Sequence, residues 1–273
     1  MWQTPAPWFC MSTADNEFKI TPIGFFKCIS RYPSEVPRQP YLSDNSGVIE
    51  IDSRFNYTSM LQGLEGFSHI WVQFLFHKNE HYKTMTAPPY MKAKKVGTWA
   101  SRSPYRPNRL GLSCLQLEGI EGRRLYVKNH DLLDGTPVLD IKPYVTQSDS
   151  HAQAKQGWLE DVEYSIYDIE FSHSVKEKIE FLRDCVDVDF YGFINTQLRQ
   201  DPLDLKKKRI KPLDENLFVI AHRTWRVIYQ VEKTKVQILD ITSGYEKEQL
   251  ARVDEDPYGD KLAHRHFIYW FSC

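Results

Sequence analysis

Apolar and polar residues alternate in short runs through the first half of the chain. The runs fall at residues 20–28, 47–52, 67–76, 110–117, 124–128 and 137–144. Gly, Pro and Asn separate them, and helical spacing of comparable length is scarce there, although residues 59–64 are compatible with a turn or two of helix. Short alternating segments joined by turns are typical of strands and predict a β-barrel or a β-sandwich.

The pattern changes after residue 144. Residues 146–157 are polar and rich in turn formers, which indicates a boundary. Helical spacing then appears at residues 174–184 and 190–200, with Ser172 and Ser174 as candidate N-caps, and strand-like runs return at residues 217–221, 224–230 and 236–241. We therefore expect a mainly β chain: a leader over residues 1–17, a β-barrel domain over residues 18–148, and a linker with a small α+β module over residues 149–273.

Composition narrows the class of protein. The 273 residues, 41% of them hydrophobic, suffice for a sizeable core. The longest apolar stretch, residues 70–76, is far shorter than the roughly 20 residues of a membrane-spanning helix, and residues 1–16 do not read as a secretory signal. Five scattered cysteines without CxxC spacing favour a reducing compartment. We expect a soluble cytoplasmic protein with no membrane partner and no structural zinc.

One stretch is strongly basic on a chain whose net charge is only -1. Residues 82–117 contain no Asp or Glu but seven Lys and Arg. Pro104 and Pro107 fix φ and favour extended geometry at the residue before each, so that Arg102 and Arg106 point in defined directions. Guanidinium groups form planar forks suited to carboxylate and phosphate. The stretch predicts a site for an anionic ligand, with a solvated surface loop as the alternative.

A second candidate is the acidic segment 131–144, DLLDGTPVLDIKPY. Asp134 begins a turn sequence and has turn closure as its simplest role. Asp140 lies among apolar residues of a strand-like run, so we expect it to be partly buried and to need a partner. The candidate partners are Arg102, Arg106 and Lys142.

Familiar catalytic signatures are missing. The chain has no GxSxG, no P-loop and no GxGxxG after a strand, which argues against a Rossmann nucleotide site. His77 and His81 lie four residues apart, but the segment is not HExxH and suggests no third ligand. We therefore expect no metal site.

A series of short motifs, taken in their order along the chain, resembles the TsaA-like family, which includes tRNA methyltransferase O. The motifs are PRQP at 37–40, GLEGFSHIW at 63–71, FLFH at 74–77, PP at 88–89, RSPYRPN at 102–108 and the acidic segment 131–144, together covering about residues 18–146. The resemblance implies a non-Rossmann β-barrel that binds S-adenosylmethionine, usually in a homodimer. It also implies an enzyme that methylates N6 of threonylcarbamoyladenosine at position 37 of tRNA, next to the anticodon.

The resemblance also implies which residues act. Cofactor contacts are implied at Pro40, Tyr41, Leu42, His77, Lys78, Arg102, Leu112, Lys128, Asn129, His130 and Asp131. RNA contacts are then expected at Arg106, Asn108 and Arg109. The cofactor's carboxylate suits Arg102, and its ammonium and ribose hydroxyls suit Asp131.

Methyl transfer to a weakly nucleophilic nitrogen calls for a proton acceptor. Asp140 and Tyr144 are the candidate catalytic residues, and Asp140 is preferred because its carboxylate is ionised at neutral pH. The rest of the catalytic effect is expected to come from alignment of donor and acceptor.

The second half departs from the family. Where members carry Asp-Pro-Arg-Pro-x-Tyr, this chain reads DPLDLK at residues 201–206, and the basic cluster at residues 206–211 is either a substitute RNA contact or a solvated run. Ser101 stands where Thr is usual, and Arg109 where Pro is common. Two alternatives stay open: a non-catalytic RNA-binding or adaptor protein on the same barrel, and a methyltransferase acting on a small molecule.

Overall fold

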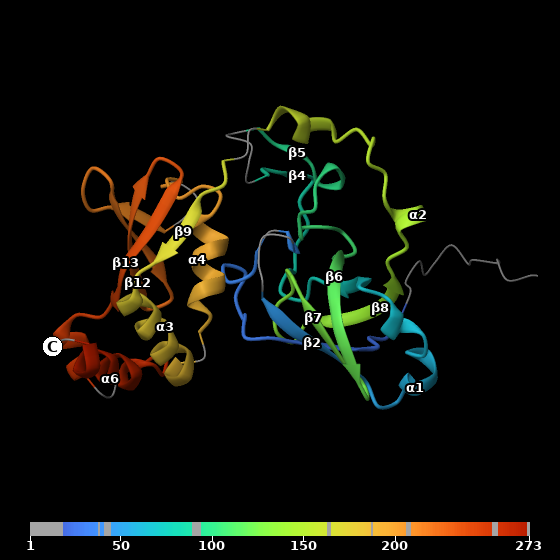
Figure 1. Ribbon diagram of the computed structural model, residues 1–273, viewed down its shortest axis with the longest axis horizontal. Helices are drawn as coiled ribbons and strands as arrows, with labels where there is room; N and C mark the ends of the chain where they lie inside the picture. Colours follow the sequence, from blue (N-terminus) through green and yellow to red (C-terminus); the bar gives the residue numbers. More distant parts are fainter. Residues whose placement is uncertain are drawn as a thin grey trace, which may run out of the picture.

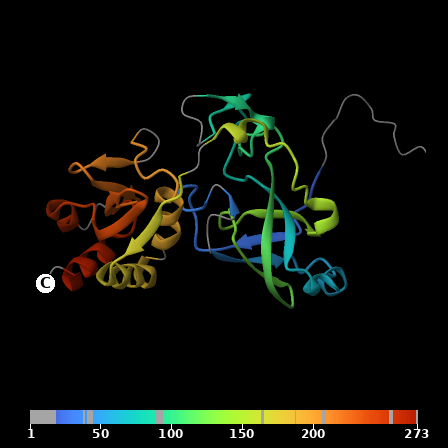
Figure 2. The same ribbon diagram turned by 45° about the horizontal axis from the view of Figure 1, so that its top comes forward.

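The computed structural model describes residues 19–37, 39–40, 45–88, 94–162, 165–186, 188–205, 209–252 and 256–271. In this part of the chain six strands close into a barrel, in the order β1-β2-β7-β6-β3-β8, and five more form a second sheet, in the order β10-β11-β12-β13-β9. The barrel and the second sheet lie side by side (Figures 1 and 2). The predicted mainly β fold, a barrel followed by a small α+β module, is confirmed.

The barrel strands follow the alternating runs of the sequence. They are β1 (Gly24–Lys27), β2 (Ser46–Ile51), β3 (His69–Leu75), β6 (Leu110–Glu121), β7 (Arg124–Lys128) and β8 (Pro137–Pro143). Every second residue points inward, and Phe26, Ile49, Ile70, Leu115 and Val138 are fully buried. Removing these side chains from water, at about 25 cal/mol per Å² of apolar surface, is what favours closure of the barrel.

All neighbouring barrel strands are antiparallel. Three connections therefore emerge at the same end: residues 28–45 after β1, residues 76–109 after β3, and residues 129–136 after β7. We call this end the loop end. The connection 76–109 carries β4 (Met85–Thr86), β5 (Val96–Gly97) and the 3₁₀ turn η3 (Thr98–Ala100). The opposite end carries α1 (Tyr57–Met60) and the 3₁₀ turn η2 (Leu64–Gly66).

The second sheet and its helices form a separate core. Its strands are β9 (Asp168–Phe171), β10 (Ile210–Pro212), β11 (Leu217–His222), β12 (Trp225–Glu232) and β13 (Lys235–Ser243). Its helices are α3 (His173–Val186), α4 (Phe190–Leu198), α5 (Lys247–Ala251) and α6 (Lys261–Phe271). Trp225, Tyr229, Phe190 and Phe193 are its largest buried side chains. Of the two candidate N-caps, Ser172 accepts a hydrogen bond from the backbone of α3, at Val175.

Between the two cores the chain forms α2 (Thr146–Asp149) and the 3₁₀ turn η4 (Gly157–Asp161). The indole of Trp158 in η4 donates to the carbonyl of Ala100 at 2.8 Å, so this linker packs on the connection 76–109. The domain limit at residue 148 stays a prediction, and the leader lies outside the described residues. No helix in the described part of the chain is long and apolar enough to span a membrane.

Candidate functional site

The loop end brings together side chains from all three connections. The Arg102 guanidinium donates to the side-chain carbonyl of Gln39 at 2.9 Å. Ser113, at the inner start of β6, donates to the Asp131 carboxylate at 2.6 Å. Burial raises the pKa of Asp131 to about 6, while the Ser113 hydrogen bond and the positive charge of Arg102 pull that pKa down. We call Gln39, Arg102, Ser113 and Asp131 the Arg102–Asp131 group.

This group offers a cation and an anion that are close enough to interact electrostatically. Arg102 is exposed and can bind a carboxylate, whereas Asp131 is half-buried and ionised at neutral pH. A ligand with both a carboxylate and an ammonium group, such as the amino-acid part of S-adenosylmethionine, matches both charges. The donor set of this structure therefore fits the cofactor that the resemblance implies.

The Asp131 turn is held from behind by Asn45. The Asn45 amide donates to the His130 carbonyl and accepts from the His130 amide, both at 2.9 Å. The His130 ring is buried against Phe26, with ring centroids 4.6 Å apart, and burial lowers the pKa of His130 to about 4. A neutral ring in the barrel interior orients Asp131 but offers little surface to a ligand.

Other residues implied as cofactor contacts lie at the same end of the barrel and contact residues outside this group. The His77 ring lies 3.4 Å from the Thr136 hydroxyl, and its pKa is lowered by burial and by the charge of Lys78, which is exposed. Lys128 is paired with Glu118 at 2.6 Å. Asn129 donates to Gln116 at 3.3 Å. Pro40 is half-buried beside Gln39, and Tyr41 and Leu42 lie outside the described residues.

Leu112 is separated from the group by the barrel wall. Its neighbour Ser113 points inward, and side chains alternate along a strand, so Leu112 points outward and is 53% exposed. A single copy of this chain therefore does not bring Leu112 to Asp131.

Arg106 and Arg109 donate hydrogen bonds within the connection 76–109 and stabilise it. Arg106 donates to the carbonyls of Ser101 at 2.8 Å and Thr98 at 3.3 Å. Arg109 has a positive φ of 53° and donates to the carbonyl of Asn79 at 3.2 Å. Asn108, between them, is exposed. The RNA contacts expected at these three residues remain predictions.

Asp140 and Tyr144 lie away from this group. Asp140 pairs with Gln73 of β3 in the middle of the barrel wall, and its half-exposed carboxylate forms an ion pair with Lys142 at 2.8 Å. Of its three candidate partners, Lys142 is the one found. Tyr144 follows β8 at the opposite end and packs on Trp71, with ring centroids 5.9 Å apart. None of the described contacts joins Asp140 or Tyr144 to the Arg102–Asp131 group.

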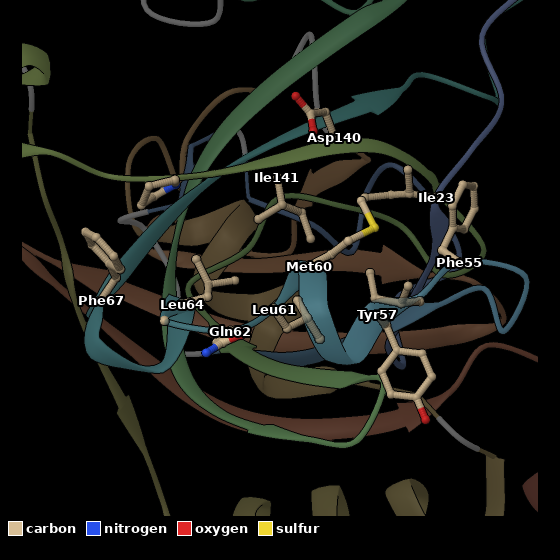
Figure 3. A pocket seen from close by; sticks show the side chains of 13 residues that line it. Ile23, Phe55, Tyr57, Met60, Leu61, Gln62, Leu64, Phe67, Asp140 and Ile141 are labelled. Atoms are coloured by element: carbon tan, nitrogen blue, oxygen red, sulfur yellow. The ribbon is translucent and has the colours of Figure 1, made fainter.

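Asp140 instead borders an apolar pocket of about 310 Å³ between α1 and β8. Figure 3 shows it at the pocket edge, apart from the side chains that α1 contributes, Tyr57 and Met60. The described residues include no cluster of three or more His, Cys, Asp or Glu that could hold a metal ion.

Sequence reasoning found both charged members of the group but missed Gln39 and Ser113 as functional residues. Ser113 carries a signal, because it is a polar residue at an inward position of a strand whose other inward residues are apolar or small. Gln39 carries no such signal, since only the folded loop places it beside Arg102.

Comparisons with known proteins agree with this fold. Residues 26–150 match the tRNA-methyltransferase O N-terminal domain family. The tRNA (adenine(37)-N6)-methyltransferase of Mus musculus is 41% identical over 156 residues, which are 54% of this chain and 36% of that protein. A probable S-adenosyl-L-methionine-binding protein of Pyrococcus abyssi is 39% identical over 140 residues, 51% of this chain and 74% of that protein. The crystal structure of TrmO from Pseudomonas aeruginosa superposes with a TM-score of 0.61 at 29% identity, covering 83% of this chain and 100% of that one.

The fold and the loop-end site thus define a TsaA-like β-barrel protein. The chain belongs to the tRNA methyltransferase O family. It spans only about a third of the length of the mammalian relatives that it matches.

Proposed function

We propose that this chain is an S-adenosylmethionine-dependent methyltransferase that acts on N6 of adenosine 37 in tRNA, with threonylcarbamoyladenosine as the target nucleoside. The observation that carries the proposal is the Arg102–Asp131 group, in which one end of a family barrel presents a guanidinium and an ionised carboxylate together. The names of the mouse and Pyrococcus relatives support the reaction and the cofactor.

In this proposal the cofactor supplies a methyl group made electrophilic by a sulfonium centre. Arg102, oriented by Gln39, binds the carboxylate of the cofactor, and Asp131, oriented by Ser113, accepts hydrogen bonds from its ammonium or ribose hydroxyl groups. The walls of the cofactor site are completed by Pro40, by the turn at His77 and Lys78, and by residues 128–130. Holding two reactants in near-attack geometry is worth several kcal/mol, up to about 7–11 in favourable cases.

The proton of the target nitrogen is assigned to Asp140, with Tyr144 as the second candidate. Asp140 carries an accessible carboxylate, but it lies on β8 away from the Arg102–Asp131 group of its own chain. The assignment therefore requires a homodimer in which the Asp140 of one copy serves the cofactor held by the other. Leu110 and Leu112, 44% and 53% exposed on the outer wall, support an apolar contact between copies.

A surface for RNA lies on the connection 76–109. Trp99 is 82% exposed and Tyr82 63% exposed, and the ammonium of Lys83 lies 4.1 Å from the centre of the Tyr105 ring. Exposed aromatic rings stack on unpaired bases, and neighbouring cations bind phosphates. Asn108 is an exposed polar residue of this surface, and the hydrogen bonds of its neighbours Arg106 and Arg109 stabilise the backbone around it. A tRNA substrate also fits the cytoplasmic location that we propose.

The test uses the purified full chain, S-adenosylmethionine with an isotopically labelled methyl group, and tRNA with or without threonylcarbamoyl at position 37. Mass spectrometry of the digested nucleosides is expected to show the label on N6 of threonylcarbamoyladenosine only. Label on unmodified adenosine 37 would retain the reaction and contradict the finer substrate. Cofactor binding without tRNA methylation would favour a small-molecule methyltransferase, and no cofactor binding would favour an adaptor.

A further inference from the structure

A buried ion pair joins the second lobe, the part built on the β9–β13 sheet, to the segment that leads into the site. Glu35, only 1% exposed, lies in the connection 28–45. The Arg223 guanidinium, from the turn between β11 and β12, donates through Nε to Glu35 Oε1 at 2.8 Å and brings Nη2 to 2.6 Å from the same oxygen. The other carboxylate oxygen accepts from the backbone amides of Arg31 at 2.8 Å and Tyr32 at 3.2 Å.

Further contacts hold the same segment against the second lobe. The Arg223 guanidinium lies 4.7 Å from the centre of the Tyr32 ring. Gln197 of α4 donates to the carbonyl of Ser34 at 2.9 Å. The His222 ring stacks on Phe193, with centroids 3.8 Å apart, and packs beside the ion pair. Two elements of the second lobe, the β11–β12 turn and α4, thus fix residues 31–35.

The two ends of this segment touch the site. Before it, the Ser30 carbonyl accepts from the Asp134 amide at 2.8 Å, and the Cys28 amide donates to the Asp134 carboxylate at 3.2 Å. After it, Gln39 accepts from Arg102 at 2.9 Å. One connection therefore links the second lobe to the Asp131 turn on one side and to Arg102 on the other.

Loss of the ion pair would disturb this connection. In the described residues the segment is tied by turn contacts and by side chains from other elements, not by strand pairing. A buried carboxylate that loses its cation is left without compensation for its lost hydration, so the segment would move to solvate it. Movement of residues 31–35 changes where Gln39 meets Arg102.

We propose that Arg223 and Glu35 are positioning residues for the cofactor site. Arg223 holds residues 31–37 in place through Glu35, and this placement sets the position of Gln39, which aims Arg102 at the carboxylate of the cofactor. The second lobe then affects cofactor binding indirectly, through Glu35 and Gln39, and not by touching the cofactor. This inference rests on the proposed function, because it takes S-adenosylmethionine as the ligand of Arg102 and Asp131.

The backbone of Arg223 supplies a matched pair of variants. Arg223 has a φ of 51°, and Lys233, in the turn between β12 and β13, has a φ of 54°. Glycine relieves the strain of a positive φ at both positions, so neither Arg223→Gly nor Lys233→Gly weakens its turn. Only Arg223→Gly removes the partner of Glu35.

The experiment measures S-adenosylmethionine binding to the wild-type chain and to the Arg223→Gly and Lys233→Gly variants by calorimetry. It also measures hydrogen exchange of residues 31–37 without ligand. We expect Arg223→Gly to raise Kd and KM for the cofactor about tenfold or more, with kcat at saturating cofactor within about twofold of wild type. We expect faster exchange of residues 31–37 in the same variant. Lys233→Gly is expected to match wild type in every measurement.

The two ideas fail separately. If wild type binds the cofactor and Arg223→Gly binds it equally well, the positioning role is overturned and the proposed function stands. If wild type does not bind the cofactor, the proposed function fails. Additive losses in the double variant Gln39→Ala with Arg223→Gly would also overturn the inference, because two residues on one route to Arg102 should not lose affinity independently.

Discussion

Asp131 titrates close to physiological pH. Burial raises its pKa to about 6, and the charge of Arg102 opposes that rise. Binding of an ammonium group needs the ionised carboxylate, so affinity for S-adenosylmethionine should fall about tenfold per unit as pH drops below about 6. Arg102→Met removes a charge that lowers the pKa, so the midpoint should move to higher pH. Calorimetric titrations between about pH 5 and 8 measure both effects.

Asp131→Asn supplies the control for this titration. Its affinity should be weak and nearly independent of pH over the same range, because the amide does not ionise. If the variant kept the wild-type pH profile, the titrating group would be another residue, and Asp131 would lose its assigned contact.

Asp140 and Lys142 allow catalysis to be separated from structure. If Asp140 accepts the proton, Asp140→Asn should lower kcat by about 100- to 10,000-fold while leaving the Kd of the cofactor nearly unchanged. Lys142→Met breaks the same ion pair but keeps the carboxylate, so it should retain most of kcat. Single-turnover kinetics with modified tRNA measure both variants. Equal, mild losses in the two would show that only the ion pair matters.

Residue type alone gave part of the site. The prolines around Arg102 predicted a directed guanidinium suited to an anionic ligand, whereas Asp131 was implied as a cofactor contact only by the family resemblance. The hydrogen bonds that Arg106 donates to carbonyls of its own loop could not be predicted from residue type. The burial of the His130 ring against Phe26 could not be predicted either, because only the fold places the two rings together.

At the scale of elements, alternation predicted the barrel strands within a few residues because each strand has one buried face. It missed β9, a short strand that pairs in parallel with β13 and so depends on a partner far along the chain. It also missed α6. Its buried positions are Lys261, His264 and Phe267, and because two of them are polar residue types, the sequence shows no apolar stripe at helical spacing. Both elements are stabilised by tertiary contacts and not by local pattern.

The buried histidine at the end of β11 makes the second lobe sensitive to acid. Burial, with a smaller effect from the charge of Arg223, lowers the pKa of His222 to about 3, and neither ring nitrogen has a hydrogen-bond partner among the described residues. The unfolded chain, with a histidine pKa of about 6.5, takes up the proton first, so the free energy of unfolding falls as pH drops from about 6.5 toward 3. At pH 5 the loss from His222 is about 2 kcal/mol.

His222→Phe keeps a ring on Phe193 and removes the titration. We expect this variant to lose about 2 kcal/mol less than wild type between pH 7 and pH 5, as measured by urea denaturation at both values. The same acid loss in variant and wild type would mean that the His222 ring is not held neutral in the folded protein.

At the scale of the whole molecule, antiparallel closure explains why residues far apart in sequence meet. Strand direction alone places the connections 28–45, 76–109 and 129–136 at one end, so a reader who had the strand order could have predicted that Arg102 and Asp131 lie together. The order itself is not readable from alternation. For the same reason, only the fold shows that Asp140 lies on the barrel wall and that Arg223 of the second lobe pairs with Glu35.

A tRNA substrate places a further demand on the whole surface, because many phosphates are bound at once. We expect tRNA affinity to fall steeply with salt, and the double variant Lys94→Ala with Lys95→Ala to reduce the slope of log K against log salt by up to about two.

Trp99→Ala should weaken tRNA binding by about tenfold without changing that slope, because stacking involves no counterion release. Trp270, 67% exposed on α6 of the second lobe, is the matched control, and Trp270→Ala should bind as wild type does. Fluorescence anisotropy with an anticodon stem-loop measures all four proteins. Equal losses from the two tryptophan variants would remove the connection 76–109 as the RNA surface, whereas a loss confined to Trp99 would place the anticodon loop beside the Arg102–Asp131 group.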